Sequence, residues 1–167
     1  MEKSLYKTKW LELKSIDTDN YSYVFSHEVR CGGKIVSILP FRRKNDGYEY
    51  LLRSEITPCW GEDPVISTIT GGVENNNIFK TALLELEEET GYVVDSLLDL
   101  GNIYISKSAD TLAYLFSVDL SDKSISIFPS GDGSYLESRA SCLWFKDVSQ
   151  SMDPLAYAIY YKLRQYI

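Results

Sequence analysis

The sequence Glu-Leu-Glu-Glu-Glu-Thr-Gly runs from position 85 to position 91. Glu85, Glu88 and Glu89 are three and four positions apart, which places their carboxylates on one face of a helix. Like charges at these spacings repel each other, and acidic groups in a last turn oppose the negative end of the helix dipole. A bound Mg²⁺ or Mn²⁺ would turn the cluster into a favourable set of oxygen ligands. Taken alone, such a segment is more often a solvated acidic face than a metal site.

The length and composition of the chain are those of an ordinary globular domain. Its 167 residues, 44% of them hydrophobic, predict one domain that spans residues 1–167. No apolar run approaches the roughly 20 residues of a membrane span. Residues 1–10 lack the apolar stretch of a secretory signal. The three cysteines are widely spaced and odd in number, which argues against a disulfide framework and favours the cytoplasm.

The charge and the histidine content exclude several functions. A net charge of −7 disfavours a nucleic-acid polymer as partner. A small nucleotide is still compatible, because a cation bound in one pocket reverses the local field. His27 is the only histidine, so one chain cannot build a two-histidine zinc site. A Ser-His-Asp triad would have to use this residue, which the alternating pattern around it assigns to an ordinary strand.

Alternating and β-branched segments predict many strands and two helices. We expect strands at 10–16, 21–28, 34–41, 48–53, 65–70, 97–106, 111–120 and 140–146, with a further one at 124–128. The first helix is expected over residues 78–90, capped by Asn76 or Asn77 and stopped by Gly91. The second is expected over residues 153–167, with an aspartate cap and a proline in its first turn. This succession indicates a mixed α/β sandwich.

A glycine-rich loop precedes the glutamates at a characteristic spacing. The sequence Gly-Gly-Val-Glu begins at Gly71, and Leu84 follows thirteen positions later, directly before the acidic run and Gly91. Together these stretches resemble the Nudix box, a loop–helix–loop that binds Mg²⁺ or Mn²⁺. Proteins of the Nudix family hydrolyse nucleoside diphosphates linked to another moiety. The resemblance implies a Nudix-type α/β/α sandwich with a mixed sheet, and Mg²⁺ or Mn²⁺ as the cofactor.

The resemblance also implies roles for individual residues. Glu85, Glu88 and Glu89 fall on the metal-binding glutamates of the family, and the last two are taken as catalytic as well. The backbone carbonyl of Thr70, just before the leading glycine, is expected to be a further metal ligand. Glu87 lies off this face and is expected to point to solvent.

Three candidate residues lie outside the box. Family members often take an additional carboxylate from a loop near the last strand to accept the proton of the attacking water. Glu137, after a Gly-rich loop, is our catalytic candidate and Asp132 the second, with a solvated loop charge as the competing interpretation. Arg53, at the end of a strand, is expected to bind a substrate phosphate, with an ordinary surface arginine as the alternative. The thirteen tyrosines do not single out a stacking partner for a base.

Two positions depart from the Nudix pattern. The loop between Gly71 and Glu85 is one residue shorter, and asparagines 75–77 stand where the family has its first glutamate. Leu84 replaces the arginine of the family. In relatives this glutamate and this arginine can form a structural salt bridge. The absence of both residues is therefore what we expect if that one interaction was lost as a whole.

Segments outside the box look like the ADP-ribose pyrophosphatase branch of the family. They are residues 100–106, residues 115–120 and the N-terminal residues 9–13. The proline that this branch carries in the turn after residues 100–106 is missing. The branch commonly forms a homodimer through N-terminal strands, so residues 1–29 are expected to be a dimerisation extension. The implied reaction splits ADP-ribose or a related nucleotide sugar into a nucleoside monophosphate and a phosphorylated product. The alternative is a non-catalytic Nudix module that binds a nucleotide as a sensor or scaffold.

Overall fold

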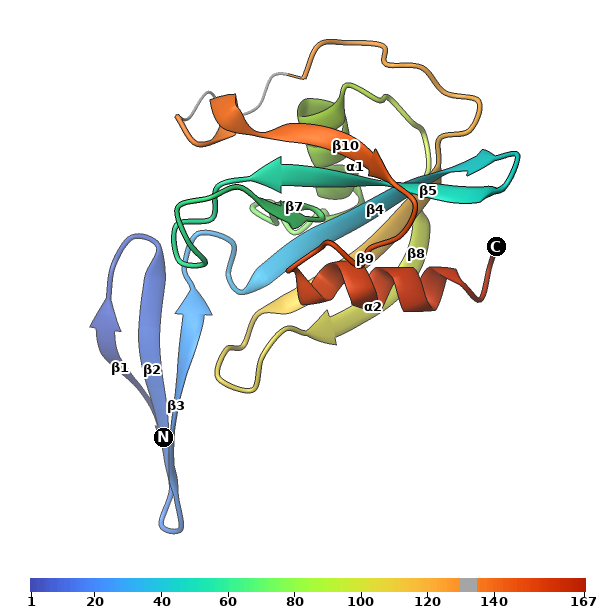
Figure 1. Ribbon diagram of the computed structural model, residues 1–167. Helices are drawn as coiled ribbons and strands as arrows, with labels where there is room; N and C mark the ends of the chain where they lie inside the picture. The colour runs from blue at the N-terminus through green and yellow to red at the C-terminus, as the bar shows by residue number, and fades with distance from the viewer. Residues whose placement is uncertain (130–134) are drawn as a thin grey trace.

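The chain folds into a sheet held between two helices, with a smaller sheet projecting from one end (Figure 1). The structure is a computed structural model and describes residues 1–129 and 135–167, the side chain of Glu137 excepted. Among these residues, no helix is both long and apolar enough to cross a membrane.

The central sheet has seven strands and is mixed. They are β4 (Lys34–Lys44), β5 (Gly47–Glu55), β6 (Val65–Ser67), β7 (Ile69–Gly72), β8 (Leu98–Tyr104), β9 (Leu112–Asp119) and β10 (Ser141–Phe145). The order is β10-β5-β4-β9-β8, with β6 paired to β5 and β7 paired to β4. Strand β4 pairs with β9 in parallel, whereas its pairs with β5 and β7 are antiparallel. Covered on both faces, β4 is a nearly continuous apolar run.

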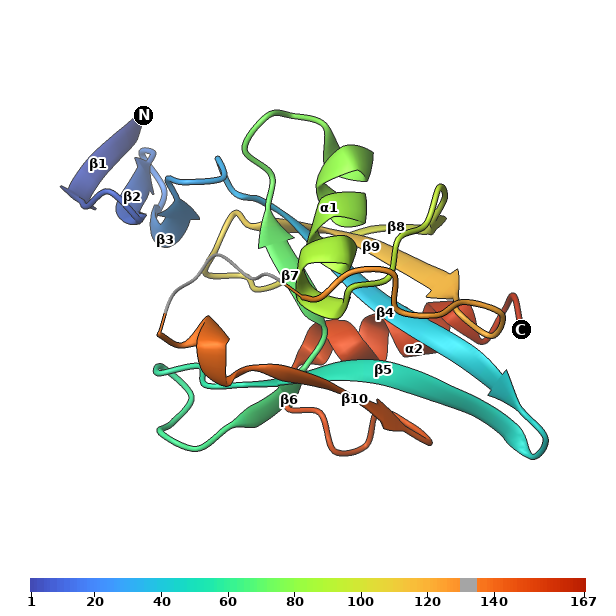
Figure 2. The same cartoon turned by 90° about the horizontal axis from the view of Figure 1, so that it is seen from above.

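Side chains that alternate along β4 and β9 build a core on each face of the sheet. Leu39 and Leu115 pack with helix α2 (Pro154–Leu163). Val36, Ile38 and Phe116 pack with helix α1 (Ile78–Thr90) on the other face. The two helices therefore lie on opposite sides of the sheet (Figure 2), and the expected α/β/α sandwich is confirmed.

The asparagines of the shortened loop shape the start of α1. Asn76 has a positive φ of 53°, which asparagine tolerates better than most residues, and its Oδ1 accepts a hydrogen bond from Lys34 Nζ (2.9 Å). The side chain of Asn77 accepts from the backbone N–H of Lys80 (3.1 Å) and caps the helix. At the other end Gly91 adopts the left-handed conformation with φ 75°. The predicted bounds of this helix are confirmed.

The predicted strand at 65–70 is divided into β6 and β7 at Thr68. The backbone N–H and the hydroxyl of Thr68 donate to Asp153 Oδ2 at 3.1 and 2.5 Å. The other oxygen of Asp153 accepts from the backbone N–H of Leu155 (2.8 Å) and caps α2. This buried carboxylate ties the bend before the glycine pair to the first turn of α2.

The strand predicted at 124–128 is wrong. The segment instead crosses the end of α1, where the backbone N–H of Ser126 donates to the carbonyl of Gly91 (2.9 Å). A Cβ at Gly91 would lie 2.2 Å from the carbonyl oxygen of Ile127. The segment was expected to pair with another strand, but its backbone N–H groups pair with the C-terminal end of α1 instead.

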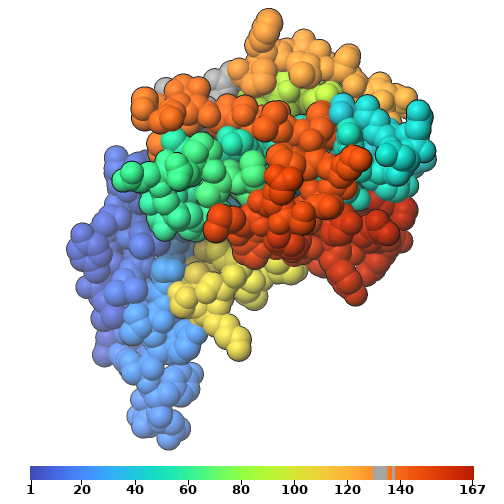
Figure 3. Space-filling model, viewed as in Figure 1, coloured from blue at the N-terminus to red at the C-terminus, as the bar shows by residue number. Residues whose placement is uncertain are grey.

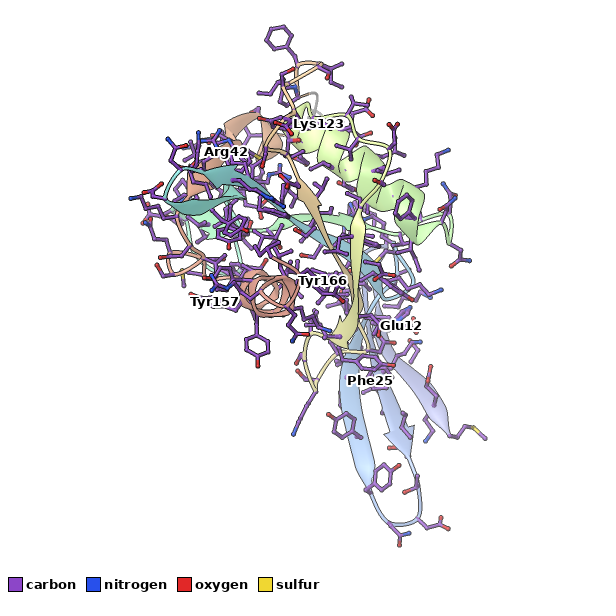
Figure 4. All side chains as sticks on the ribbon, turned by 90° about the vertical axis from the view of Figure 1, so that its right-hand side faces the viewer. Glu12, Phe25, Arg42, Lys123, Tyr157 and Tyr166 are labelled. Carbon is purple, nitrogen blue, oxygen red and sulfur yellow. The ribbon has the colours of Figure 1, made fainter. Side chains whose placement is uncertain are left out.

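Residues 2–28 form the projecting sheet, with the order β1 (Glu2–Lys7), β2 (Leu11–Asp17), β3 (Ser22–Glu28). Strand β1 was not expected from the sequence. The sheet stands out as an arm in the space-filling view (Figure 3). Hydrogen bonds between Ser26 and the segment of Ser108 and Asp110 join it to the body, and His27 Nδ1 lies 2.8 Å from Asp110 Oδ2. Glu12 and Phe25 lie where the arm meets the body (Figure 4).

Candidate active site

A cleft of about 480 Å³ opens beside the C-terminal half of α1. Its walls come from α1, from β5 and β7, from the loop after β7, and from the turn that precedes β4. The lining side chains and backbone belong to Arg30, Arg53, Glu55, Thr70, Gly71, Gly72, Glu74, Asn75, Thr81, Leu84, Glu85, Glu88 and Glu89. Segments more than fifty residues apart in the sequence thus share one surface.

The three glutamates predicted as metal ligands lie together in this cleft. Glu85, Glu88 and Glu89 all line it, and Thr70 faces them from β7, whereas Glu87 is not part of the lining. One helical face therefore carries the carboxylates, as their spacing predicts. Their roles as ligands stay predictions.

The glycine pair allows α1 to approach the sheet at this point. A Cβ at Gly71 would lie 1.9 Å from the Cδ and Oε1 atoms of Glu85. No side chain fits between the strand and this carboxylate. The glycine at this position therefore lets Glu85 reach over the backbone of β7.

Arg53 lies at the floor of the cleft in a buried ion-pair network. Only 5% of its surface is exposed, and its Nη1 forms an ion pair with Glu89 Oε1. Its Nε lies 3.4 Å from Glu55 Oε2, and the hydroxyl of Ser67 donates to the other oxygen of Glu55 (2.7 Å). Arg53 thus lines the cleft as expected, with its guanidinium held between two carboxylates. Its binding of a phosphate stays a prediction.

Burial raises the pKa of Glu89 above its ordinary value, and the positive charge of Arg53 opposes the shift. Beneath this pair, Cys142 Sγ lies 3.6 Å from the carbonyl oxygen of Glu89, to which it donates. Burial raises the pKa of the Cys142 thiol to about 12, and burial together with Glu28 raises that of Cys31 to about 11. Neither thiol supplies a nucleophilic thiolate at neutral pH.

The cleft suits a hard cation by its donor chemistry. Its described lining carries five carboxylates against two guanidinium groups, and Thr70 is part of the same lining. Nevertheless, in residues 1–129 and 135–167 no group of three or more acidic, histidine or cysteine side chains is arranged so that it could hold a metal ion. The ion pair with Arg53 holds one of the three glutamates. The residues fit Mg²⁺ or Mn²⁺ in kind and charge.

The further catalytic candidates are not placed. Glu137 begins the short 3₁₀ helix η1 (Glu137–Arg139) before β10, and its side chain lies outside the described part of the structure. Asp132 lies outside the described residues as well.

Arg30, Glu55 and a second cavity beside the cleft were not expected from the sequence. This cavity of about 380 Å³ shares Arg30, Glu55 and residues 70–72 with the cleft and contains Trp60. Arg30 lies in a turn and Trp60 in a loop, so neither follows a periodic pattern. No local signal links these residues to the glutamates.

No protein-family model matches the chain, and no curated protein matches it. Among solved structures, one described as an ADP compounds hydrolase has a similar fold, with a TM-score of 0.68. The alignment covers 99% of this chain and 91% of that chain, at 12% sequence identity. At such low identity the likeness establishes the fold, and it extends through the N-terminal arm. The Nudix-type fold expected from the sequence is therefore confirmed.

Proposed function

We propose that the protein is a Nudix hydrolase that splits a nucleoside diphosphate linked to another moiety and requires Mg²⁺ or Mn²⁺. ADP-ribose or a related nucleotide sugar is the proposed substrate, in keeping with the ADP-ribose pyrophosphatase branch. The products are a nucleoside monophosphate and a phosphorylated remainder. One observation carries the proposal: Glu85, Glu88 and Glu89 line a single cleft together with Thr70 and the side-chain-free Gly71. The similar solved structure, named for ADP compounds, supports it.

We assign different roles in hydrolysis to different residues of the chain. Glu85, Glu88, Glu89 and the carbonyl of Thr70 would hold the cation, which supplies charge neutralisation of the phosphate oxygens when bound. Glu88, exposed in the cleft, and Glu89, at its floor, are assigned to orienting and deprotonating the attacking water. Glu137 is the further candidate for that proton.

The test is a substrate panel with and without divalent cation. ADP-ribose with Mg²⁺ is expected to give AMP, and a chelator should stop the reaction. Absence of turnover over a wide panel of dinucleotides, nucleotide sugars and nucleoside triphosphates, with Mg²⁺ and with Mn²⁺, would overturn the proposal. Faster cleavage of oxidised purine triphosphates than of ADP-ribose would overturn the substrate preference alone.

A second candidate is a non-catalytic module that senses a nucleotide or scaffolds a partner. Two features favour it: among the described side chains no group of three or more acidic, histidine or cysteine residues is arranged so that it could hold a metal ion, and Leu84 stands where the family has its arginine. Nucleotide binding measured by calorimetry, with no turnover in the same panel, would support this function over hydrolysis.

Replacing Gly71 with alanine is expected to impair catalysis with little loss of stability. The new Cβ would displace the carboxylate of Glu85, which is the flexible end of a side chain, so the fold can adjust. Misplacing a catalytic group by about 1 Å costs on the order of 100-fold in rate. The rate of AMP release and the thermal midpoint are measured together. The control for the rate is Gly47→Ala, at a position outside the cleft where the added Cβ meets nothing within 4 Å. Because Gly47 has a φ of 140°, alanine there is expected to lower the thermal midpoint while the rate of AMP release stays unchanged. An unchanged rate for Gly71→Ala would contradict the role of Glu85.

We also propose that the N-terminal arm forms a homodimer. Pairing across β1, β2 and β3 places Tyr6, Leu11, Leu13 and Val24 on one face of the arm, all of them exposed. Such an apolar face favours association. Light scattering should give twice the 19.1 kDa of one chain, and Leu13→Glu should reduce the mass to that of the monomer. A monomeric mass for the unmodified protein at about 50 μM, a typical working concentration well above the Kd of a stable dimer, would contradict the proposal.

The setting that we propose is cytoplasmic, with a small nucleotide as partner. All three cysteines are free, in keeping with a reducing compartment. The net charge of −7 disfavours a nucleic-acid polymer.

A further inference from the structure

The second cavity adjoins the cleft. Residues 70–72, Arg30 and Glu55 line both of them. A ligand that spans the two would lie beside Arg30. The two compartments differ in character, since more of the second one is lined by apolar side chains.

Trp60 gives the second cavity an aromatic wall. It lies in the loop between β5 and β6, where its backbone N–H donates to the carbonyl of Thr57 (2.8 Å). Because 46% of the surface of Trp60 is exposed, its indole is not part of the hydrophobic core. Ile35, Ile105 and Leu155 line the same cavity from three other parts of the chain. The combination is typical of a pocket for a flat, uncharged group.

Charge decides which end of a nucleotide fits here. Glu28, Glu55 and Asp153 line the second cavity, against the single guanidinium of Arg30. Such a lining repels a phosphate and accepts a neutral ring that carries hydrogen-bond donors. The phosphates belong in the neighbouring cleft, where a cation would offset the carboxylates. Arg30, at the border, is placed to contact the phosphate that joins the two parts.

We propose that the second cavity binds the aromatic base of the nucleotide, stacked on Trp60, while Arg30 contacts the phosphate next to the nucleoside. This inference rests on the proposed function for the placement of the phosphates. It makes Trp60 a substrate-binding residue that determines whether a nucleotide is recognised through its base.

Three substitutions of Trp60 test the stacking directly. Trp60→Ala and Trp60→Leu are expected to raise the KM for ADP-ribose and the Kd for AMP by about 5- to 100-fold, the usual effect of losing one base–aromatic stack. Trp60→Phe should stay within about threefold of the unmodified protein, because the ring is kept. The kcat should change little in all three, since stacking on the base is the same in the ground state and the transition state. Tyr161→Ala, an exposed aromatic residue on α2 outside both cavities, is the control.

The outcomes separate this inference from the proposed function. Hydrolysis with an unchanged KM and Kd in Trp60→Ala, or equal effects of leucine and phenylalanine, would overturn the base site and leave the enzyme proposal standing. Binding of AMP that depends on an aromatic residue at position 60, without any turnover, would overturn the enzyme proposal and support the base site. The thermal midpoint of each variant shows whether it folds.

Discussion

Replacing Glu88 with glutamine is expected to lower the kcat for ADP-ribose hydrolysis by about 10²- to 10⁴-fold, the range for loss of a general base. Glutamine keeps the size of the side chain but removes the negative charge that a cation and the proton of a water both require. Glu88 is exposed in the cleft, so the free energy of unfolding should be nearly unchanged. The measurement is the rate of AMP release over a range of Mg²⁺ concentrations.

Glu87→Gln is the matched control for this experiment. It removes the same charge from the adjacent position of α1, outside the lining of the cleft. Its kcat should equal that of the unmodified protein. A Glu88→Gln variant as active as Glu87→Gln would remove Glu88 from the catalytic machinery.

Replacing Arg53 with methionine is expected to reduce the free energy of unfolding by about 3–5 kcal/mol, the typical cost of removing one partner from a buried ion pair. The side chain of Glu89 is only 10% exposed, so without its partner it becomes a buried, uncompensated charge. Urea unfolding at pH 8 measures the loss. Arg43→Met, which breaks the exposed contact of Arg43 with Asp119, should cost less than about 1 kcal/mol.

The pH dependence of the stability lost in Arg53→Met identifies the charged group that causes the loss. Burial already raises the pKa of Glu89, and loss of the Arg53 charge should raise that pKa further. A carboxyl group whose pKa is raised on folding stabilises the folded state more as the pH falls, because it binds its proton more tightly there. The deficit of Arg53→Met should therefore shrink between pH 8 and pH 5. The double variant Arg53→Met/Glu89→Gln should recover part of the lost free energy of unfolding at pH 8. A double variant with no recovery would show that the uncompensated charge of Glu89 is not the cause of the loss.

Local patterns account for the parts of the fold that depend on neighbours in the sequence. The 3.6-residue period predicts the span of α1, and the spacing of Glu85, Glu88 and Glu89 predicts their common face. Both are properties of one helix, and its cap and its stop are encoded by Asn77 and Gly91 within a residue of its ends.

Sequence patterns predicted the strands wrongly where a segment pairs with a distant part of the chain. The strand expected at 124–128 is absent because its backbone meets the end of α1. The strand expected at 65–70 breaks at Thr68 because the carboxylate of Asp153, 85 residues away, takes its donors. Hydrogen-bond partners of this kind carry no periodic signal.

The class of fold and the acidic face of α1 follow from local sequence patterns, as does the glycine that lets this face approach the sheet. The partners of that face depend on the folded chain as a whole. Folding brings Arg53 of β5 against Glu89, and it places Arg30 and Trp60 on the cavity beside the cleft. A helical face is set by local geometry, whereas ion pairs and cavities depend on which strands lie side by side in the sheet.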